Sequence, residues 1–334
     1  MPTARDGGAR PQRWQRLGAM ARSPWLRAGV TLLLLALVFS RLDWGLIEQR
    51  LRQGRPLDFL LAVALVLLAL VAGACRWRAL LHRAGIPLGT SRLARIYAVS
   101  MFSTTFLPTA AGGDVTRALL VTRRGPELRR VVVSVLMDRA GGLAGLITIA
   151  WLALALEPSR VPDGARAVLG WTTLGLALGV LLMLAAALRG GRVGRRLLPA
   201  RVVEIAREAR EVLRDYARSP GLLAAWLLLS VAYQALIASQ LVVLGHAIDV
   251  ELPFATAAVA LALVTIVTMI PRSIGGFGIR EGSYVVLLGG ASIAASDATL
   301  ISVLSVAALL VASLPGAYLI ARGDIGAAPE PAVR

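Results

Sequence analysis

Long apolar stretches separated by short arginine-rich segments dominate the pattern of the chain. About 20 apolar helical residues cross a hydrocarbon core of ~30 Å, and several stretches have this length. Their apolar positions are continuous rather than alternating, which excludes the strands of a membrane β-barrel. The pattern therefore predicts an all-α polytopic membrane protein. The expected full spans are 27–42, 57–75, 131–156, 167–188, 221–245 and 298–321.

Two further apolar runs, 93–121 and 254–289, are interrupted near their middle. The first contains Pro108-Thr109-Ala110-Ala111-Gly112-Gly113 and the second Pro271-Arg272-Ser273-Ile274-Gly275-Gly276. Proline and paired glycines break helices, and the segments on either side of each run carry charge of the same sign. We therefore expect two re-entrant helical hairpins in addition to the six full spans. Non-helical backbone is tolerated at that depth only where protein or a water-filled cavity surrounds it.

The two interruptions belong to an internal duplication. The pattern Pro108-x3-Gly112-Gly113-x3-Arg117 recurs 163 residues later and ends at Arg280, while Pro56 and His82 recur 164 residues later as Pro220 and His246. The predicted repeats cover about 56–157 and 220–321. Because their loops carry opposite charge, we expect opposite topology. An inverted repeat whose broken helices meet at the midplane is typical of transporters.

The charge distribution orients the chain. The formal net charge is +17 and the mean hydropathy is +0.71, with 57% hydrophobic residues. The arginines flank apolar runs, so we read them as orientation signals of membrane helices and not as a nucleic-acid surface. Segments 1–27, 76–95, 122–130 and 189–220 are basic, whereas 246–252 and 289–297 are acidic. The basic group is expected on the inside, which predicts a bacterial inner-membrane protein with both termini in the cytoplasm.

The domain organisation follows from this path. We expect a basic cytoplasmic N-terminus over 1–26, an uncleaved first span, a membrane domain over 27–325 and a short tail over 326–334. The span 167–188 and an amphipathic cytoplasmic helix over 198–218 would link the two repeats.

Charged residues within or beside the apolar segments are the candidate functional residues. A charge at the membrane centre costs about 2.5–3.5 kcal/mol on insertion scales, so such residues normally line a bundle interior or a watery cavity. Two half-helices that start after glycine pairs would direct positive helix ends and arginines at the midplane, which suits an anion such as phosphate. The candidate substrate-binding residues are Asp114, Arg117, Asp138, Arg139, Arg272, Arg280, Glu281, Gly112, Gly113, Gly275 and Gly276.

A purely structural role is the alternative for several of these residues. Asp114 could cap its own half-helix and pair with Arg117 three residues on. Asp138 could neutralise either Arg280 or Arg117 across the bundle, and Arg139 could extend towards the interface. We favour an anion-binding role for Arg117 and Arg280, and we expect Glu281 to keep Arg280 charged.

Other chemistry is not indicated by the sequence. His82 and His246 are expected at the membrane interface rather than on a metal, and Cys75 is the single cysteine. We find no catalytic triad order, phosphate-binding loop or zinc-binding motif, and we expect no cofactor. The polar residues of the span 221–245 are predicted to form interhelical hydrogen bonds: Ser230, Tyr233, Gln234, Ser239 and Gln240.

Three motifs in order carry a family resemblance: Pro108 to Arg117, then Asp138-Arg139, then Pro271 to Gly282. With them the chain resembles, over about 25–325, the membrane region of lysylphosphatidylglycerol synthases, the flippase-like domain of MprF-type multiple peptide resistance proteins and their stand-alone bacterial relatives. The resemblance implies translocation of a lipid between leaflets. The full synthases carry a soluble aminoacyl-transferase domain after this region, whereas the chain ends at Arg334, so we do not expect it to make the lysyl lipid.

These observations favour a non-enzymatic, flippase-like transporter of a phosphate-bearing lipid, either a phospholipid or a polyprenyl phosphate, with membrane lipids as its partners. Two alternatives remain open at this stage. One is a membrane-integral transferase acting on lipid-linked substrates, with Asp138 or Glu281 as general base. The other is a non-transporting scaffold in which the buried charges only hold the helices together.

Overall fold

The computed structural model describes residue 45 and residues 54–106, 112–122, 125–178, 210–269 and 278–322. Every regular element in this part of the chain is helical. The expected all-helical membrane class is confirmed, since four of these helices are long and apolar enough to cross a membrane: α4 (Pro56–Arg83), α7 (Gly125–Leu156), α10 (Pro220–Ala247) and α13 (Ala295–Arg322). Of the other two expected spans, 27–42 lies outside the described residues, and 167–188 is described, as helix, only to residue 178.

Two pairs of short helices lie between the long ones. α5 (Thr90–Phe106) packs against α6 (Gly112–Val121), and α11 (Phe254–Thr268) packs against α12 (Ile279–Gly289). Both interrupted runs therefore form two helices each, as expected. The order long, short, short, long occurs twice along the chain, from α4 to α7 and from α10 to α13.

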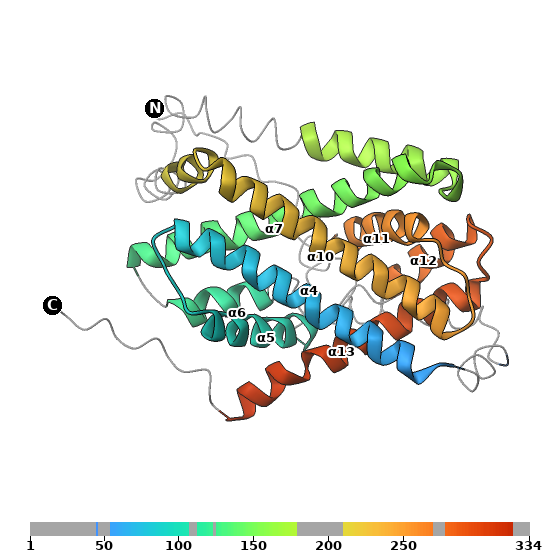
Figure 1. Cartoon of the computed structure of the whole chain (residues 1–334), viewed down its shortest axis with the longest axis horizontal. Helices are drawn as coiled ribbons and strands as arrows, with labels where there is room; N and C mark the ends of the chain where they lie inside the picture. The colour runs from blue at the N-terminus through green and yellow to red at the C-terminus, as the bar shows by residue number, and fades with distance from the viewer. Residues whose placement is uncertain are drawn as a thin grey trace, which may run out of the picture.

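The equivalent helices α4 and α10 cross the centre of the molecule in opposite directions (Figure 1). Each is 28 residues long and starts at a proline, whose fixed φ and missing N–H suit the first helical position. The amide of Arg55, before α4, donates to the carbonyl of Ala247 at the end of α10. At the other end, the Tyr216 hydroxyl donates to the carbonyl of Leu80 at 3.0 Å. Burial raises the pKa of Tyr216, which keeps this hydroxyl a donor.

Glycines allow neighbouring helices of the bundle to approach one another closely. A Cβ atom at Gly145 of α7 would lie 2.5 Å from the backbone of Ser230 on α10, and one at Gly141 would lie 2.6 Å from the Trp226 indole nitrogen. Gly316 of α13 meets the Ala98 carbonyl of α5 in the same way, at 2.2 Å. Such close approach is the usual means of helix association in a membrane, where no water drives apolar surfaces together.

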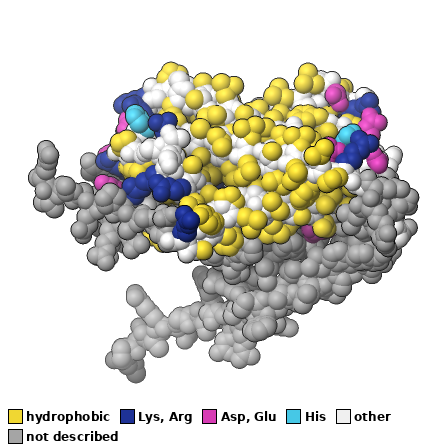
Figure 2. All heavy atoms as spheres, turned by 60° about the horizontal axis from the view of Figure 1, so that its bottom comes forward, with side chains coloured by type: hydrophobic (Ala, Val, Ile, Leu, Met, Phe, Trp, Pro, Cys, Tyr) yellow, Lys and Arg dark blue, Asp and Glu magenta, His cyan; other side chains and the backbone are white. Residues whose placement is uncertain are grey.

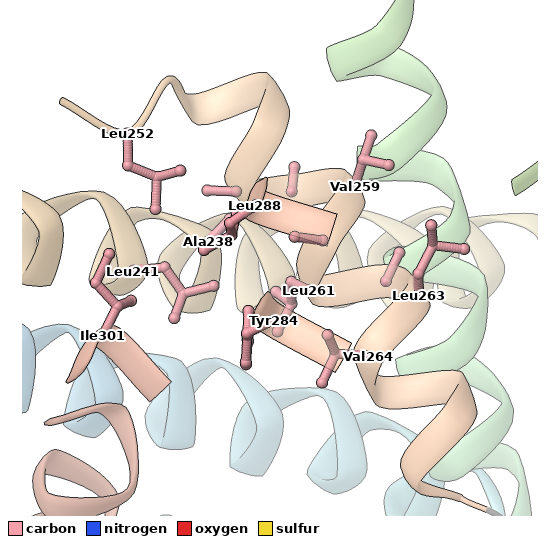
Figure 3. Packing of buried hydrophobic residues seen from close by; sticks show 14 of the residues in the cluster. Ala238, Leu241, Leu252, Val259, Leu261, Leu263, Val264, Tyr284, Leu288 and Ile301 are labelled. Carbon is pink, nitrogen blue, oxygen red and sulfur yellow. The ribbon is translucent and has the colours of Figure 1, made fainter. Parts of the chain in front are cut away.

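The largest apolar core is formed by α7, the segment 161–169 and α10 to α13, and Figure 3 shows part of it. Residues 255–264 of α11 are all buried. Because α11 is apolar on every side and too short to span a membrane, its whole surface can be covered by protein. The second half of the chain therefore holds an interrupted helix inside the bundle.

Hydrophobic side chains cover the middle of the face in Figure 2, and charged side chains gather at both ends. At 1.5 Å per residue, a 28-residue helix is about 42 Å long, so it exceeds the ~30 Å hydrocarbon core. This distribution fits a protein whose long helices run from one membrane surface to the other.

One expectation about the loops is wrong. The basic segment 76–95 was expected between helices, but α4 continues through Arg83 and α5 begins at Thr90. The apolar run before residue 76 ends without a proline or a glycine pair, so the helix continues and carries its first arginine into the bundle.

Candidate functional site: a charged cavity between the two halves

A cavity of about 450 Å³ lies inside the bundle and is lined by α4 to α7 and α10 to α13. Its volume falls within the usual range for small-ligand sites. The cavity brings together five of the residues that the sequence singled out, from both halves of the chain, and adds Arg76. The charged lining residues are Arg76, Asp114, Arg117, Asp138, Arg139 and Arg280.

Five of these side chains form a continuous chain of ion pairs. Asp138 accepts from the Arg76 Nε at 2.7 Å and from an Arg117 terminal nitrogen at 2.6 Å. Arg117 also pairs with Asp114 at 2.8 Å, and Arg139 donates to the second oxygen of Asp114. Three guanidinium groups therefore share two carboxylates, which leaves this chain with one excess positive charge.

Arg117 is buried and contacts two aspartates and two aromatic rings, while its Nε has no hydrogen-bond partner among the described residues. Its side chain is 5% exposed, and its guanidinium lies 5.0 Å from the Trp77 ring centroid and 5.6 Å from that of Tyr97. Cation–π contacts of this kind stabilise a desolvated guanidinium. Trp77 is fixed in turn because its indole N–H donates to the Ser134 hydroxyl at 3.1 Å. Asp138 was expected to neutralise either Arg280 or Arg117, and in the structure it pairs with Arg117.

Arg76 is the residue that the sequence reasoning missed. It is 4% exposed, donates to the Ser230 hydroxyl at 3.1 Å as well as to Asp138, and lies over the Tyr233 ring. It was assigned to a basic loop because arginines at the end of an apolar run usually mark the cytoplasmic side. The internal duplication could have indicated Arg76. The 164-residue offset that pairs His82 with His246 also pairs Arg76 with Gln240, one of the polar residues of α10, and Arg76 and Gln240 both line the cavity.

Arg280 reaches the cavity from the other half of the chain. It is the second residue of α12 and lines the cavity together with Tyr284, one turn further on. Among the described residues, Arg280 has no carboxylate partner in a salt bridge. Glu281 does not serve it as expected, because its carboxylate accepts the Gly278 amide at 2.6 Å, within its own helix start, and is 1% exposed.

Of the four candidate glycines, the structure describes Gly112 and Gly113 at the start of α6. α6 begins at Gly112, and a Cβ atom at Gly113 would lie 1.9 Å from the Thr104 hydroxyl and 2.6 Å from the Ser100 carbonyl. Gly113 therefore allows α6 to pack closely on α5. Three further candidates lie outside the described residues: Arg272, Gly275 and Gly276.

Uncharged polar residues of the cavity wall bond to backbone carbonyls. Gln234 donates to Gly142 at 2.8 Å and Gln240 to Ser305 at 3.4 Å. The expectation of interhelical hydrogen bonds along α10 is confirmed for these two residues and for Ser230. Ser100 and Thr104 likewise donate to the carbonyls of Gly113 and Ser100.

The two histidines lie away from the cavity. His246, at the end of α10, bonds to Asp58 at 2.8 Å and to Arg55 at 3.0 Å, so it joins this end of α10 to the start of α4. Within the described ranges, no group of three or more His, Cys, Asp or Glu residues is placed to hold a metal ion.

The fold and the cavity define a polytopic helical membrane protein with buried charge between two four-helix halves. The family model of the lysylphosphatidylglycerol synthase TM region matches residues 25–316. The chain belongs to this family, as the resemblance of its three motifs indicated. No curated protein matches the chain.

Proposed function

We propose that the protein is a flippase-like transporter that moves a phosphate-bearing lipid between the two leaflets. The observation that carries the proposal is that Arg117 and Arg280, from equivalent positions of the two repeats, line one cavity inside the helix bundle. The headgroup phosphate would bind in this cavity, while the hydrocarbon chains stay in the bilayer. Membership of a lipid-related membrane family supports the same function.

In this proposal Arg280 is the principal anion ligand. Two carboxylates already bind Arg117, whereas no described carboxylate pairs with Arg280. The guanidinium fork binds two phosphate oxygens at once. Arg117, Arg76 and Arg139 would supply the surrounding positive potential.

The proposed architecture is an inverted repeat with two re-entrant hairpins, α5–α6 and α11–α12. The repeated order of helix lengths and the opposite directions of α4 and α10 support it. Rocking of one repeat against the other would alternate access to the cavity. We further propose a bacterial inner-membrane location with both termini in the cytoplasm, from the charge of the loops.

Transport rather than catalysis is proposed because the buried acids already have partners. Asp138 accepts from two guanidinium groups, and Glu281 accepts from a backbone amide. A carboxylate bound in this way is a weak general base. Formation of a new lipid by the purified protein, incubated with a nucleotide-sugar and a polyprenyl phosphate, would contradict this part of the proposal.

The test is lipid exchange between leaflets in proteoliposomes, followed with a labelled phospholipid and a labelled polyprenyl phosphate. Loss of a charge-assisted hydrogen bond of about 1.5–3 kcal/mol predicts that Arg280→Ala slows exchange by about tenfold or more. The control is Arg322→Ala, since Arg322 stacks on Tyr318 at the end of α13 and does not line the cavity. Equal exchange by the wild type and Arg280→Ala would refute the proposal.

A further inference from the structure

The net charge of the cavity lining indicates the charge of the anion that the cavity would bind. Four arginines and two aspartates line it, which gives a net charge of +2 if all six are ionised. The buried carboxylate of Glu281 lies outside the cavity lining and is bound to the start of its own helix.

The net positive charge favours an anionic ligand, although part of it is hydrated, since the Arg139 side chain is 41% exposed. A ligand of charge −1 would leave the cavity positive, whereas a dianion would balance the lining. A phosphate diester carries one negative charge. A phosphate monoester carries between −1.5 and −2 at neutral pH, because its second pKa is about 6.

The uncharged part of the cavity wall adds polar and apolar surface to the charged lining. Six polar lining residues already direct a donor at a backbone carbonyl: Ser100, Thr104, Gln234, Gln240, Thr268 and Ser305. These donors are therefore committed to the protein. The hydroxyls of three tyrosines also belong to the lining, Tyr97, Tyr233 and Tyr284, so the preference for a monoester over a diester rests on the charge of the lining. The remaining wall is largely apolar, with residues such as Leu70, Leu261 and Leu309.

We infer that the cargo of this cavity is a lipid phosphate monoester, a dianion at the end of a hydrocarbon chain, rather than a phosphodiester phospholipid. The inference rests on the proposed lipid-transport function and narrows it to one substrate class. Arg280 would bind the terminal phosphate, and the net charge of the lining would set the preference for the second negative charge.

The experiment compares dodecyl phosphate with its methyl ester, which has the same chain but one ionisable oxygen fewer. Both are titrated against the full-length protein in a neutral detergent and followed by native mass spectrometry, at pH 8 and pH 5.5. We expect the monoester to bind at least about tenfold more tightly at pH 8, because one more charge interacts with the excess arginines. At pH 5.5 the monoester is mostly a monoanion, so its advantage should fall to about twofold or less. Binding of the methyl ester, which has no second ionisation, serves as the reference for pH effects on the protein.

Variants distinguish ligand binding in the cavity from ligand binding elsewhere on the protein. Arg280→Gln should lose most of the preference at pH 8, and Arg280→Lys should retain it because the charge remains. Arg322→Gln, outside the cavity, should bind both ligands as the wild type does. Inorganic phosphate is titrated as well, and it should bind at least about tenfold more weakly than dodecyl phosphate, because it leaves the apolar wall uncovered.

The outcomes distinguish the inference from the function on which it rests. Equal or tighter binding of the methyl ester that still depends on Arg280 would overturn the monoester inference and leave anionic lipid transport standing. Inorganic phosphate bound as tightly as dodecyl phosphate would overturn a lipid cargo. Binding of neither lipid in an Arg280-dependent manner would overturn both the inference and the proposed function.

Discussion

Removing the shared carboxylate of the ion-pair chain should destabilise the protein more than any exposed charge substitution. Asp138 is buried and binds two guanidinium groups at 2.6 and 2.7 Å, each 5% exposed or less. Asp138→Asn keeps the shape but removes the charge and presents an amide donor to one of the two arginines. Breaking a buried pair from one side costs about 3–5 kcal/mol, because the partner is left charged and unpaired. We expect the free energy of unfolding to fall by that amount.

The assay is reversible unfolding in mixed micelles of dodecyl sulfate and a maltoside, followed by circular dichroism. Asp163→Asn is the control, since Asp163 pairs with Arg166 at 3.1 Å but its side chain is 94% exposed, and such pairs contribute about 1 kcal/mol or less. The double variant with Arg76→Gln should be more stable than the sum of the two single changes predicts, by at least about 1 kcal/mol. A loss below about 1 kcal/mol in Asp138→Asn would refute the reasoning.

Three further predictions concern packing and topology. Gly145→Ala should lower the free energy of unfolding by about 1–3 kcal/mol, because its Cβ would lie 2.5 Å from the α10 backbone, whereas Gly142→Ala meets nothing within 4 Å and should not. Tyr216→Phe should cost about 1 kcal/mol in the same unfolding assay through loss of its hydrogen bond to α4. Cysteines are introduced at Arg214 and Asp249 in a background that lacks the native cysteine. They should be labelled from opposite sides of the membrane, because the 28 residues of α10 separate the two positions. Labelling of both positions from one side would contradict the topology.

The sequence predicted the helices well because each depends on local signals. Continuous apolar runs marked the four long helices to within about eight residues at each end, and the prolines and glycine pairs marked both interruptions. The two copies of each feature reinforced one another. The charge of the flanking loops predicts that the copies are inverted, and this stays a prediction.

The pairing of the buried charges could not be predicted to the same extent. The sequence brought Arg117, Asp138 and Arg280 to one depth, but which acid binds which arginine depends on how three helices pack. Arg76 was missed because the rule for cytoplasmic arginines takes no account of a helix that continues into the bundle. The bond of Glu281 to Gly278 was not foreseen, although an acid three residues after Gly278 is the common pattern of a capped helix start.

The most direct test of the central claim is an experimental structure of the protein in lipid nanodiscs that contain an anionic phospholipid and a polyprenyl phosphate. The account predicts that α5–α6 and α11–α12 enter the membrane from opposite sides, with the phosphate of a lipid within hydrogen-bond distance of the Arg280 guanidinium in the cavity. Either interrupted segment crossing straight through the membrane, or Arg280 in bulk water far from Arg117, would contradict it.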